Sequence, residues 1–282
     1  MNVSQGLVVL ATFMVIGLRV QPSLSKIQNG IQVFSQHRES SDAALNLLTF
    51  YSSFNREPKT HIGEVVFNEK IDVIVEVKDL QYEFQDGNSL FNGLNFIFPK
   101  PGIYLLKGKN GVGKTTLLEI FSGLRKPSFG YITLNGQNIT ELDAEDIAIG
   151  ISFLSQKPSF ANQSIVHSLL LERHSQKRNE DRLNKSLEIL KTLGLDLQKY
   201  NIKEVLELDS LLSEGEKQKI GLARALSRKQ RLILLDEPTS SLDLHAMMAL
   251  KKLLTLEYTG CFIFIACHDK FFDDVSEGEI WI

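Results

Sequence analysis

The chain has few cysteines, no basic block and no long apolar segment, and each shortage excludes a class of protein. Only two of its 282 residues are cysteine. Cys261 and Cys267 lie six positions apart in one apolar segment and would share a face of a strand. This spacing favours two buried thiols in a reducing compartment over a disulfide or a metal pair. The net charge of −3, without a basic block, argues against a nucleic-acid partner.

The first apolar segment, residues 6–18, carries no charge over thirteen positions. It is too short to cross a bilayer alone, since a spanning helix needs about twenty residues. No basic residue precedes it, and the sequence around Arg19 is a poor signal-peptide cleavage site. Two interpretations remain: a buried core helix, or the inner part of a membrane helix whose outer part precedes Met1.

Apolar residues then recur at helical spacing and predict a helix over about residues 23–54. Such a helix extends roughly 45–50 Å, a length suited to a rod between a membrane and a cytosolic module. Arg19, Lys26 and Arg38 follow the apolar segment and no basic residue precedes it, which predicts that its C-terminal side faces the cytosol. Helical periodicity is lost over residues 55–72, which we expect to form a linker.

From residue 71 onward, apolar segments rich in β-forming residues alternate with helical patterns. This alternation predicts an α/β domain with an antiparallel β flank near its start. The apolar segments are residues 73–77, 96–98, 103–106, 131–134, 149–154, 232–235 and 262–266.

Residues 108–115 read G-x-x-x-x-G-K-T, the spacing of a loop that wraps backbone amides around a triphosphate. The glycines let the loop curl inward, so that successive N–H groups point at phosphate oxygens. Lys114 would reach the β- and γ-phosphates, and the hydroxyl of Thr115 would bind Mg²⁺. A strand-like segment precedes the loop and a helical one follows, as the motif requires. The predicted ATP-binding residues here are Gly108, Asn110, Gly111, Gly113, Lys114, Thr115 and Thr116.

Two further segments carry polar groups suited to phosphate chemistry. Residues 232–237 form a buried-strand pattern that ends in Asp236 and Glu237, at the strand end where ligands of α/β sheets bind. Asp236 would hold Mg²⁺ through the coordination shell of the ion. Glu237 would orient or deprotonate the attacking water. Ser213 opens a helix with Glu216 three residues on, a capping-box pattern that is compatible with a further anion site at the free N–H groups.

Residues from about 71 to 282 resemble the nucleotide-binding domain of an ATP-binding cassette (ABC) transporter. The phosphate loop, the segment 212–216 and the acidic strand occur in the order of that family. Gln156 matches its glutamine loop, Asp243 its aspartate loop and His268 its switch histidine. The resemblance implies a P-loop ABC ATPase fold with a mixed sheet core, an antiparallel β flank and a helical subdomain.

The resemblance also implies a role for each matching residue. Lys114, Gln156, Glu237 and His268 form the expected catalytic set. His268 would contact the γ-phosphate, and Gln156 would join Thr115 and Asp236 at Mg²⁺. An aromatic side chain stacks on adenine in the family, and Phe84 is the preferred match, although strand alternation also permits Tyr82. The expected metal ligands are Thr115, Gln156 and Asp236.

In the family, two such domains dimerise head to tail, and the segment containing Ser213 contacts the ATP of the partner. The residues expected to act in trans are Ser213, Glu214, Gly215 and Asp243. The usual segment is Leu-Ser-Gly-Gly-Gln, whereas this chain has Glu214 and Glu216. Glu214 adds a carboxylate near a γ-phosphate unless its side chain points away and only its amide donates.

These features together predict the C-terminal part of an exporter half-transporter that couples ATP hydrolysis to transport. Residues 1–54 would be part of the last transmembrane helix with its cytosolic extension, 55–72 a linker and 73–282 the nucleotide-binding domain. That domain would lie on the cytoplasmic side of a membrane, with the other transmembrane helices in a missing N-terminal part or a separate chain. Met1 would be an internal start, a gene split or a fragment boundary. The alternatives are the peripheral ATPase of an importer, a soluble ABC ATPase and a non-catalytic nucleotide sensor.

Overall fold

The structure is a computed structural model, and the part of the chain that it describes lies within one compact unit, His61–Ile282. The predicted membrane helix with its extension, residues 1–54, and the predicted linker, 55–72, lie outside the described residues. None of the described helices has the length and apolar character needed to cross a membrane. The described residues are 74–84, 87–142, 147, 150–160, 164–171, 179–197, 200, 202, 204, 208–228 and 230–282.

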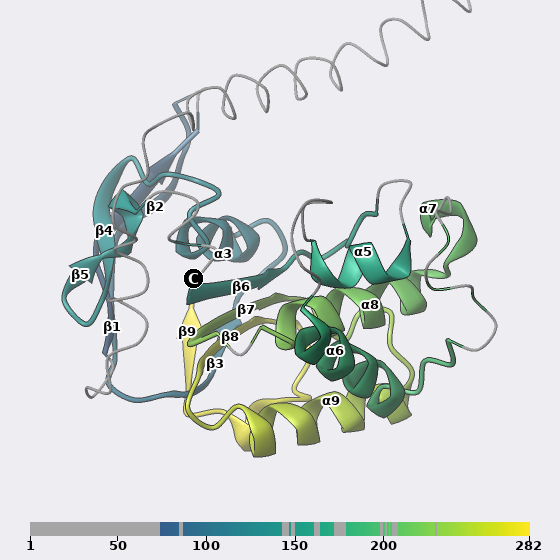
Figure 1. The fold of residues 1–282 in the computed structure, drawn as a ribbon. Helices are drawn as coiled ribbons and strands as arrows, with labels where there is room; N and C mark the ends of the chain where they lie inside the picture. The colour runs from purple at the N-terminus through teal and green to yellow at the C-terminus, as the bar shows by residue number, and fades with distance from the viewer. Residues whose placement is uncertain are drawn as a thin grey trace, which may run out of the picture. The chain divides into compact units, whose positions relative to one another are not determined.

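A five-stranded parallel sheet forms the centre of the fold (Figure 1). Its strands in spatial order are β6 (Ile151–Leu154), β7 (Leu232–Asp236), β8 (Phe262–Ala266), β3 (Gly102–Lys107) and β9 (Gly278–Trp281). Every residue of β7 and β8 is buried. Parallel strands covered on both faces need continuous apolar sequence, which is the pattern seen in these two segments.

A second sheet is antiparallel and lies beside the first, which confirms the predicted β flank. Its strand order is β2 (Ser89–Phe98), β1 (Val75–Glu83), β4 (Phe129–Leu134) and β5 (Gln137–Asn138). An aromatic cluster joins the sheets: the ring of Phe98 lies 4.8 Å from Tyr104 and 4.8 Å from Phe264, measured between centroids. Edge-to-face pairs of this kind add to the stabilisation from burial alone.

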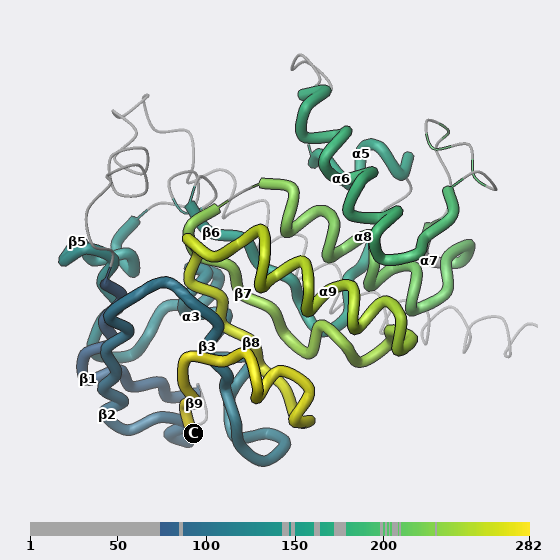
Figure 2. The backbone as a smooth tube through the Cα atoms, turned by 90° about the horizontal axis from the view of Figure 1, so that it is seen from below, coloured from purple at the N-terminus to yellow at the C-terminus, as the bar shows by residue number. Residues whose placement is uncertain are grey.

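Alternate residues of the parallel sheet face two separate cores. Tyr104, Leu234 and Phe264 face α3 (Lys114–Phe121) and the antiparallel sheet. Leu105 and Leu235 face the other helices. The helices after α3 in the described part of the chain are α5 (Ile165–Leu170), α6 (Glu180–Thr192), α7 (Leu208–Leu211), α8 (Glu214–Leu226) and α9 (Leu244–Glu257), with short 3₁₀ turns at Ile139–Glu141 and Asp273–Val275. Figure 2 shows α5 to α8 grouped at the end of the domain away from β1 and β2, as the predicted helical subdomain requires.

Candidate functional site

The loop between β3 and α3 presents an uncapped helix start. Gly113 precedes α3 with a φ of 107°, in the left-handed region. A Cβ at this position would stand 2.7 Å from Leu90 and 2.8 Å from the ring of Phe91, so only glycine fits. Within the described part of the chain, no side chain caps α3 and its first turn carries no acidic residue. Its first N–H groups therefore remain available to an external anion, which the helix dipole also favours.

Lys114 lies inside this loop with 6% of its surface exposed. Its Nζ donates to the carbonyl oxygens of Gly108 and Lys109, both at 3.0 Å. Burial lowers the pKa of Lys114, and the nearby carboxylates of Glu237 and Asp236 act in the opposite direction. Neutral carbonyls bind an ammonium group less strongly than charged phosphate oxygens do. An incoming phosphate would therefore replace them as partners of Lys114.

Thr115 and Asp236 join α3 to the end of β7. The hydroxyl of Thr115 donates to Oδ2 of Asp236 at 2.7 Å. Asp236 is 2% exposed, and burial raises its pKa while the hydrogen bond from Thr115 opposes that rise. A hydroxyl and a carboxylate side by side are oxygen donors of the kind that Mg²⁺ prefers. These two residues fit the predicted magnesium site.

Three strands of the parallel sheet deliver the predicted catalytic side chains to one place. Gln156 follows β6, Glu237 follows β7 and His268 follows β8, and these strands are neighbours in the sheet. Nε2 of Gln156 donates to Oε2 of Glu237 at 2.9 Å, and Nε2 of His268 lies 3.0 Å from Oε1. Both carboxylate oxygens of Glu237 are therefore held. Gln156, predicted also as a metal ligand, uses its amide nitrogen on Glu237 and keeps its carbonyl oxygen for a further contact.

A pocket of about 440 Å³ collects these groups. It includes every predicted phosphate-loop residue except Gly108, which contributes through its carbonyl to Lys114. Leu90 on β2 also lines the pocket, and sequence reasoning missed it because it reads as one more apolar strand residue. The lining residues are Phe84, Leu90, Asn110, Gly111, Gly113, Lys114, Thr115, Thr116, Gln156, Asp236, Glu237 and His268.

The two aromatic candidates for adenine stacking have different surroundings. Phe84 is 40% exposed and lines the pocket. The hydroxyl of Tyr82 accepts a hydrogen bond from Nη1 of Arg125 at 2.7 Å, and Arg125 also pairs with Glu119 at 2.7 Å. The rings of Tyr82 and Phe84 form a T-shaped pair, with centroids 5.2 Å apart. Phe84 is thus the one of the two aromatic residues that lines the pocket, and Tyr82 packs beside it.

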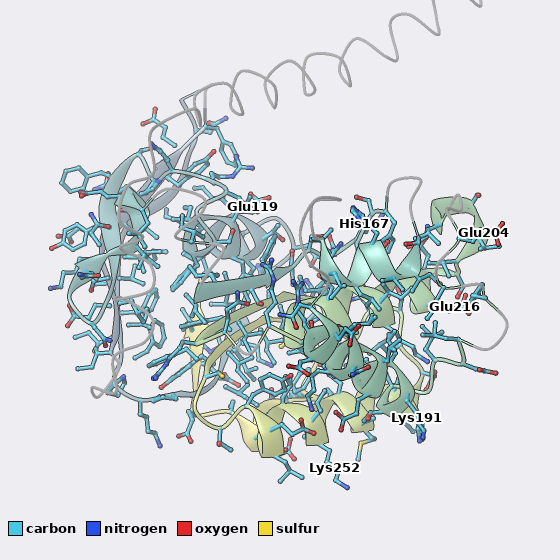
Figure 3. All side chains as sticks on the ribbon, in the orientation of Figure 1. Glu119, His167, Lys191, Glu204, Glu216 and Lys252 are labelled. Carbon is cyan, nitrogen blue, oxygen red and sulfur yellow. The ribbon has the colours of Figure 1, made fainter. Side chains whose placement is uncertain are left out.

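The predicted in-trans residues lie outside the pocket, at the starts of α8 and α9. Ser213 forms a full capping box: Oε2 of Glu216 accepts from the Ser213 amide at 3.0 Å and from its hydroxyl at 2.8 Å. The hydroxyl of Tyr200 donates to Oε1 of Glu216 at 3.0 Å. Glu214 instead pairs with Nζ of Lys217 at 3.0 Å. Figure 3 shows Glu216 well away from α3, the helix that carries Glu119.

The loop before α9 touches α8 directly. Asp243 caps α9 by accepting from the amide of Ala246 at 2.9 Å, and it also pairs with Lys219 at 3.2 Å. Both contacts lower the pKa of Asp243, the backbone contact most. A Cβ on Gly215 would stand 2.7 Å from the carbonyl oxygen of Ser241, so the two backbones meet closely.

Comparison with solved structures supports the fold. A bacterial Atm1-family ABC exporter with ATP bound superimposes with a TM-score of 0.64 at 20% identity, over 74% of this chain and 37% of the other. The dimeric ATP-binding cassette MJ0796, in a post-hydrolysis state with ADP and Pi, superimposes with a TM-score of 0.62 at 24% identity, over 74% of this chain and 94% of the other.

Sequence comparison identifies the family. The lactococcin-A transport/processing ATP-binding protein LcnC of Lactococcus lactis is 29% identical over 237 residues, which are 83% of this chain and 32% of LcnC. This chain thus spans about a third of that relative. The energy-coupling factor transporter ATP-binding protein EcfA of Methanococcus maripaludis is 32% identical over 74% of this chain and 75% of EcfA. A family model described as ABC transporter matches residues 91–240. The chain belongs to the ABC transporter family and carries its ATPase domain.

Proposed function

We propose that this chain hydrolyses Mg²⁺-ATP in the pocket beside α3, paired head to tail with a second nucleotide-binding domain, and that hydrolysis drives export across a membrane. The observation that carries the hydrolytic part is the contact of Gln156 and His268 with the two carboxylate oxygens of Glu237, in the same pocket as Lys114. A carboxylate held from both sides beside a phosphate-binding loop is arranged to direct water at a γ-phosphate.

The residues divide the work of hydrolysis between binding and attack. Lys114 and the backbone amides at the start of α3 neutralise the charge of the phosphates. Phe84 and Leu90 contact the adenine ring. Thr115 and Asp236 would hold Mg²⁺, which would supply positive charge that stabilises the transferring phosphate. Glu237 orients the water or accepts its proton as the water oxygen bonds to the γ-phosphorus. The bond between the γ-phosphorus and the bridging oxygen then breaks, and ADP leaves.

Two substitutions test this assignment by separating turnover from binding. Glu237→Gln keeps the shape of the side chain but removes the carboxylate, so ATP should bind normally while phosphate release falls by about 100-fold or more. Lys114→Ala should instead weaken ATP affinity itself, because charge-assisted bonds to phosphate are lost. Phosphate release and fluorescent-nucleotide titration measure the two effects. Unchanged phosphate release by the Glu237→Gln variant would remove Glu237 from the role of base.

The extent of the sequence matches supports the exporter interpretation. The match to LcnC covers 83% of this chain, so it must include residues that precede residue 74. The matches to the energy-coupling factor ATP-binding proteins cover 70–74% of this chain and can lie entirely within residues 74–282. We accordingly assign residues 1–54 to the end of a transmembrane helix with its extension, 55–72 to a linker and 73–282 to the cytoplasmic ATPase domain. The remaining membrane helices would precede this segment or belong to a separate chain.

A peripheral subunit of an importer is the second candidate. EcfA supports it, because this chain covers 75% of that relative at 32% identity. Expression of the 282-residue chain followed by membrane extraction distinguishes the two. An exporter fragment anchored by residues 1–54 should stay in the pellet at alkaline pH in carbonate. Complete release by high salt would overturn the exporter proposal and favour a peripheral subunit.

A further inference from the structure

One buried amide beside the site has no role in the mechanism above. Gln218 lies on α8 and is 1% exposed. Burying a side-chain amide without a hydrogen-bond partner costs stability. The hydrogen-bond partner of Gln218 therefore indicates the role of this residue. Nε2 of Gln218 donates to the backbone carbonyl oxygen of Glu237 at 3.3 Å. The helix that carries Ser213 at its start therefore contacts the main chain of the candidate base.

Two glycines bring α8 close enough for this contact. Gly215, Gln218 and Gly221 are spaced three residues apart, which sets them on one face of the helix. A Cβ on Gly221 would stand 2.7 Å from Leu154 and 2.8 Å from Pro158, which lie two positions before and two positions after Gln156. A Cβ on Gly215 would be as close to the loop after Glu237. This face of α8 is thus fitted to the loops that carry Gln156 and Glu237, with Gln218 at its centre.

The backbone of Glu237 needs such support. Its φ is 45°, in the left-handed region that a residue with a side chain occupies at a cost. Strained positions of this kind persist when the surroundings fix them. The Glu237 amide donates to the carbonyl of Ala266 at 2.9 Å, and its carbonyl accepts from the amide of Ser240 at 3.2 Å as well as from Gln218. Gln218 is the one side chain among these three partners.

We propose that Gln218 is a positioning residue for ATP hydrolysis, which fixes the strained main chain of Glu237 so that its carboxylate meets Gln156 and His268. The side chain of Glu237 is held at its far end by Gln156 and His268, and its main chain is held by Gln218. Loss of the amide donor lets the peptide of Glu237 rotate and moves the carboxylate away from the water. This inference rests on the proposed role of Glu237 and adds the element that sets its orientation.

Gln218→Met tests the proposal in the 282-residue chain, because methionine matches the length of glutamine and has no donor. We expect kcat for ATP to fall about five- to tenfold, the effect of one lost hydrogen bond, with KM within twofold of its original value. In a Glu237→Gln background, Gln218→Met should change the residual rate by less than twofold, since the group it orients is gone. Ser227→Ala is the matched control, because Ser227 is also buried, at the C-terminal cap of α8, and its hydroxyl donates to the Arg224 carbonyl of the same helix.

A second measurement keeps the test independent of turnover. Amide hydrogen exchange of residues 236–241, followed by mass spectrometry without nucleotide, should speed up in Gln218→Met and stay unchanged in Ser227→Ala. Faster exchange together with a lower kcat supports the proposal. Unchanged exchange overturns it, even if the original chain proves inactive, and so does an equal loss of rate in the Glu237→Gln background. An inactive chain that still shows faster exchange would count against the proposed function alone.

Discussion

The starts of α3 and α8 are two versions of the same feature, one open and one closed. α3 begins after Gly113, without a side-chain cap or an acid in its first turn among the described residues. α8 begins after Ser213, with a complete capping box and with Glu214 and Glu216 in its first turn. Both helix starts offer N–H groups and a favourable dipole to an anion. α3 leaves them to an external ligand. In α8 the N–H of Glu216 donates to the Ser213 hydroxyl, and the N–H of Ser213 donates to the Glu216 carboxylate.

The difference has an electrostatic counterpart. Around α3, burial lowers the pKa of Lys114 and raises that of Asp236, so each ionised group there lacks part of the solvation it had in water. At α8, Ser213 and Tyr200 direct three hydrogen bonds to the carboxylate of Glu216, which is therefore well solvated by the protein. The first region is arranged to receive charged groups, and the second is complete as it stands.

Giving α3 the carboxylate of α8 should produce the largest effect. Thr116 is the third residue of α3, as Glu216 is of α8, and it lines the pocket. Thr116→Glu would place a negative charge among the N–H groups that bind phosphate, so ATP affinity should fall by about 100-fold or more. Fluorescent-nucleotide titration measures it. Thr116→Gln, of equal size and no charge, should lose far less; equal losses would show that size and not charge decides.

Removing the carboxylate of Glu216 at the start of α8 should have a smaller effect, and it should raise activity. The hydroxyl of Ser213 now donates to Glu216, so it cannot also donate to a phosphate. Glu216→Gln keeps a capping residue but replaces the charged acceptor of this hydroxyl by a neutral, weaker one, so a phosphate can compete for the hydroxyl and kcat for ATP should rise about two- to fivefold in the paired state. Glu214→Gln is the control, because Glu214 faces Lys217 and should change kcat less. A fall in kcat for Glu216→Gln would mean that the carboxylate itself is needed.

The smallest expected effect concerns stability and pH. Because the pKa of Asp236 is raised in the folded state, the folded chain binds that proton more tightly, and stability falls as pH rises through the ordinary range of Asp toward the raised pKa. Asp236→Asn removes this loss, so the ligand-free variant should melt a few degrees higher than the original chain at pH 8, with the difference vanishing near pH 4. Thermal unfolding at both pH values measures it.

Asp243 provides the opposite case for the same experiment. Its pKa is lowered by Ala246 and Lys219, so its charge stabilises the fold above the ordinary pKa of Asp, and this stabilisation is lost as pH falls through the lowered value. Asp243→Asn should therefore lower the melting temperature slightly at pH 8. If both variants shifted in the same direction, local charge would not be the cause.

Much of the fold was predictable because its segments have strong local signals. The segments 232–235 and 262–266 read as buried strands, and both are strands in the structure. Boundaries were less predictable: the strand expected at 96–98 is the end of β2, a ten-residue strand. The outer face of β2 is partly exposed and mixed in polarity, so its first half carries no clear periodicity in the sequence.

Parts of the candidate site could not be found this way. Leu90 and Gln218 have no motif of their own, and they matter because β2 and α8 bring them to the pocket and to Glu237. The spacing predicted the capping box of Ser213 and Glu216, and the structure confirms it. The spacing left open where the carboxylate of Glu214 points, and in the structure it pairs with Lys217.

The sequence by itself determined the family, the phosphate loop and the order of the polar segments, because glycine, lysine and acidic residues at fixed spacing have few other physical uses. Only the tertiary structure decided which groups meet: that β6, β7 and β8 bring Gln156, Glu237 and His268 together, and that α8 reaches the main chain of Glu237. These contacts join residues that are as far as 81 positions apart in the sequence. They depend on strand order and helix packing, which no local pattern encodes.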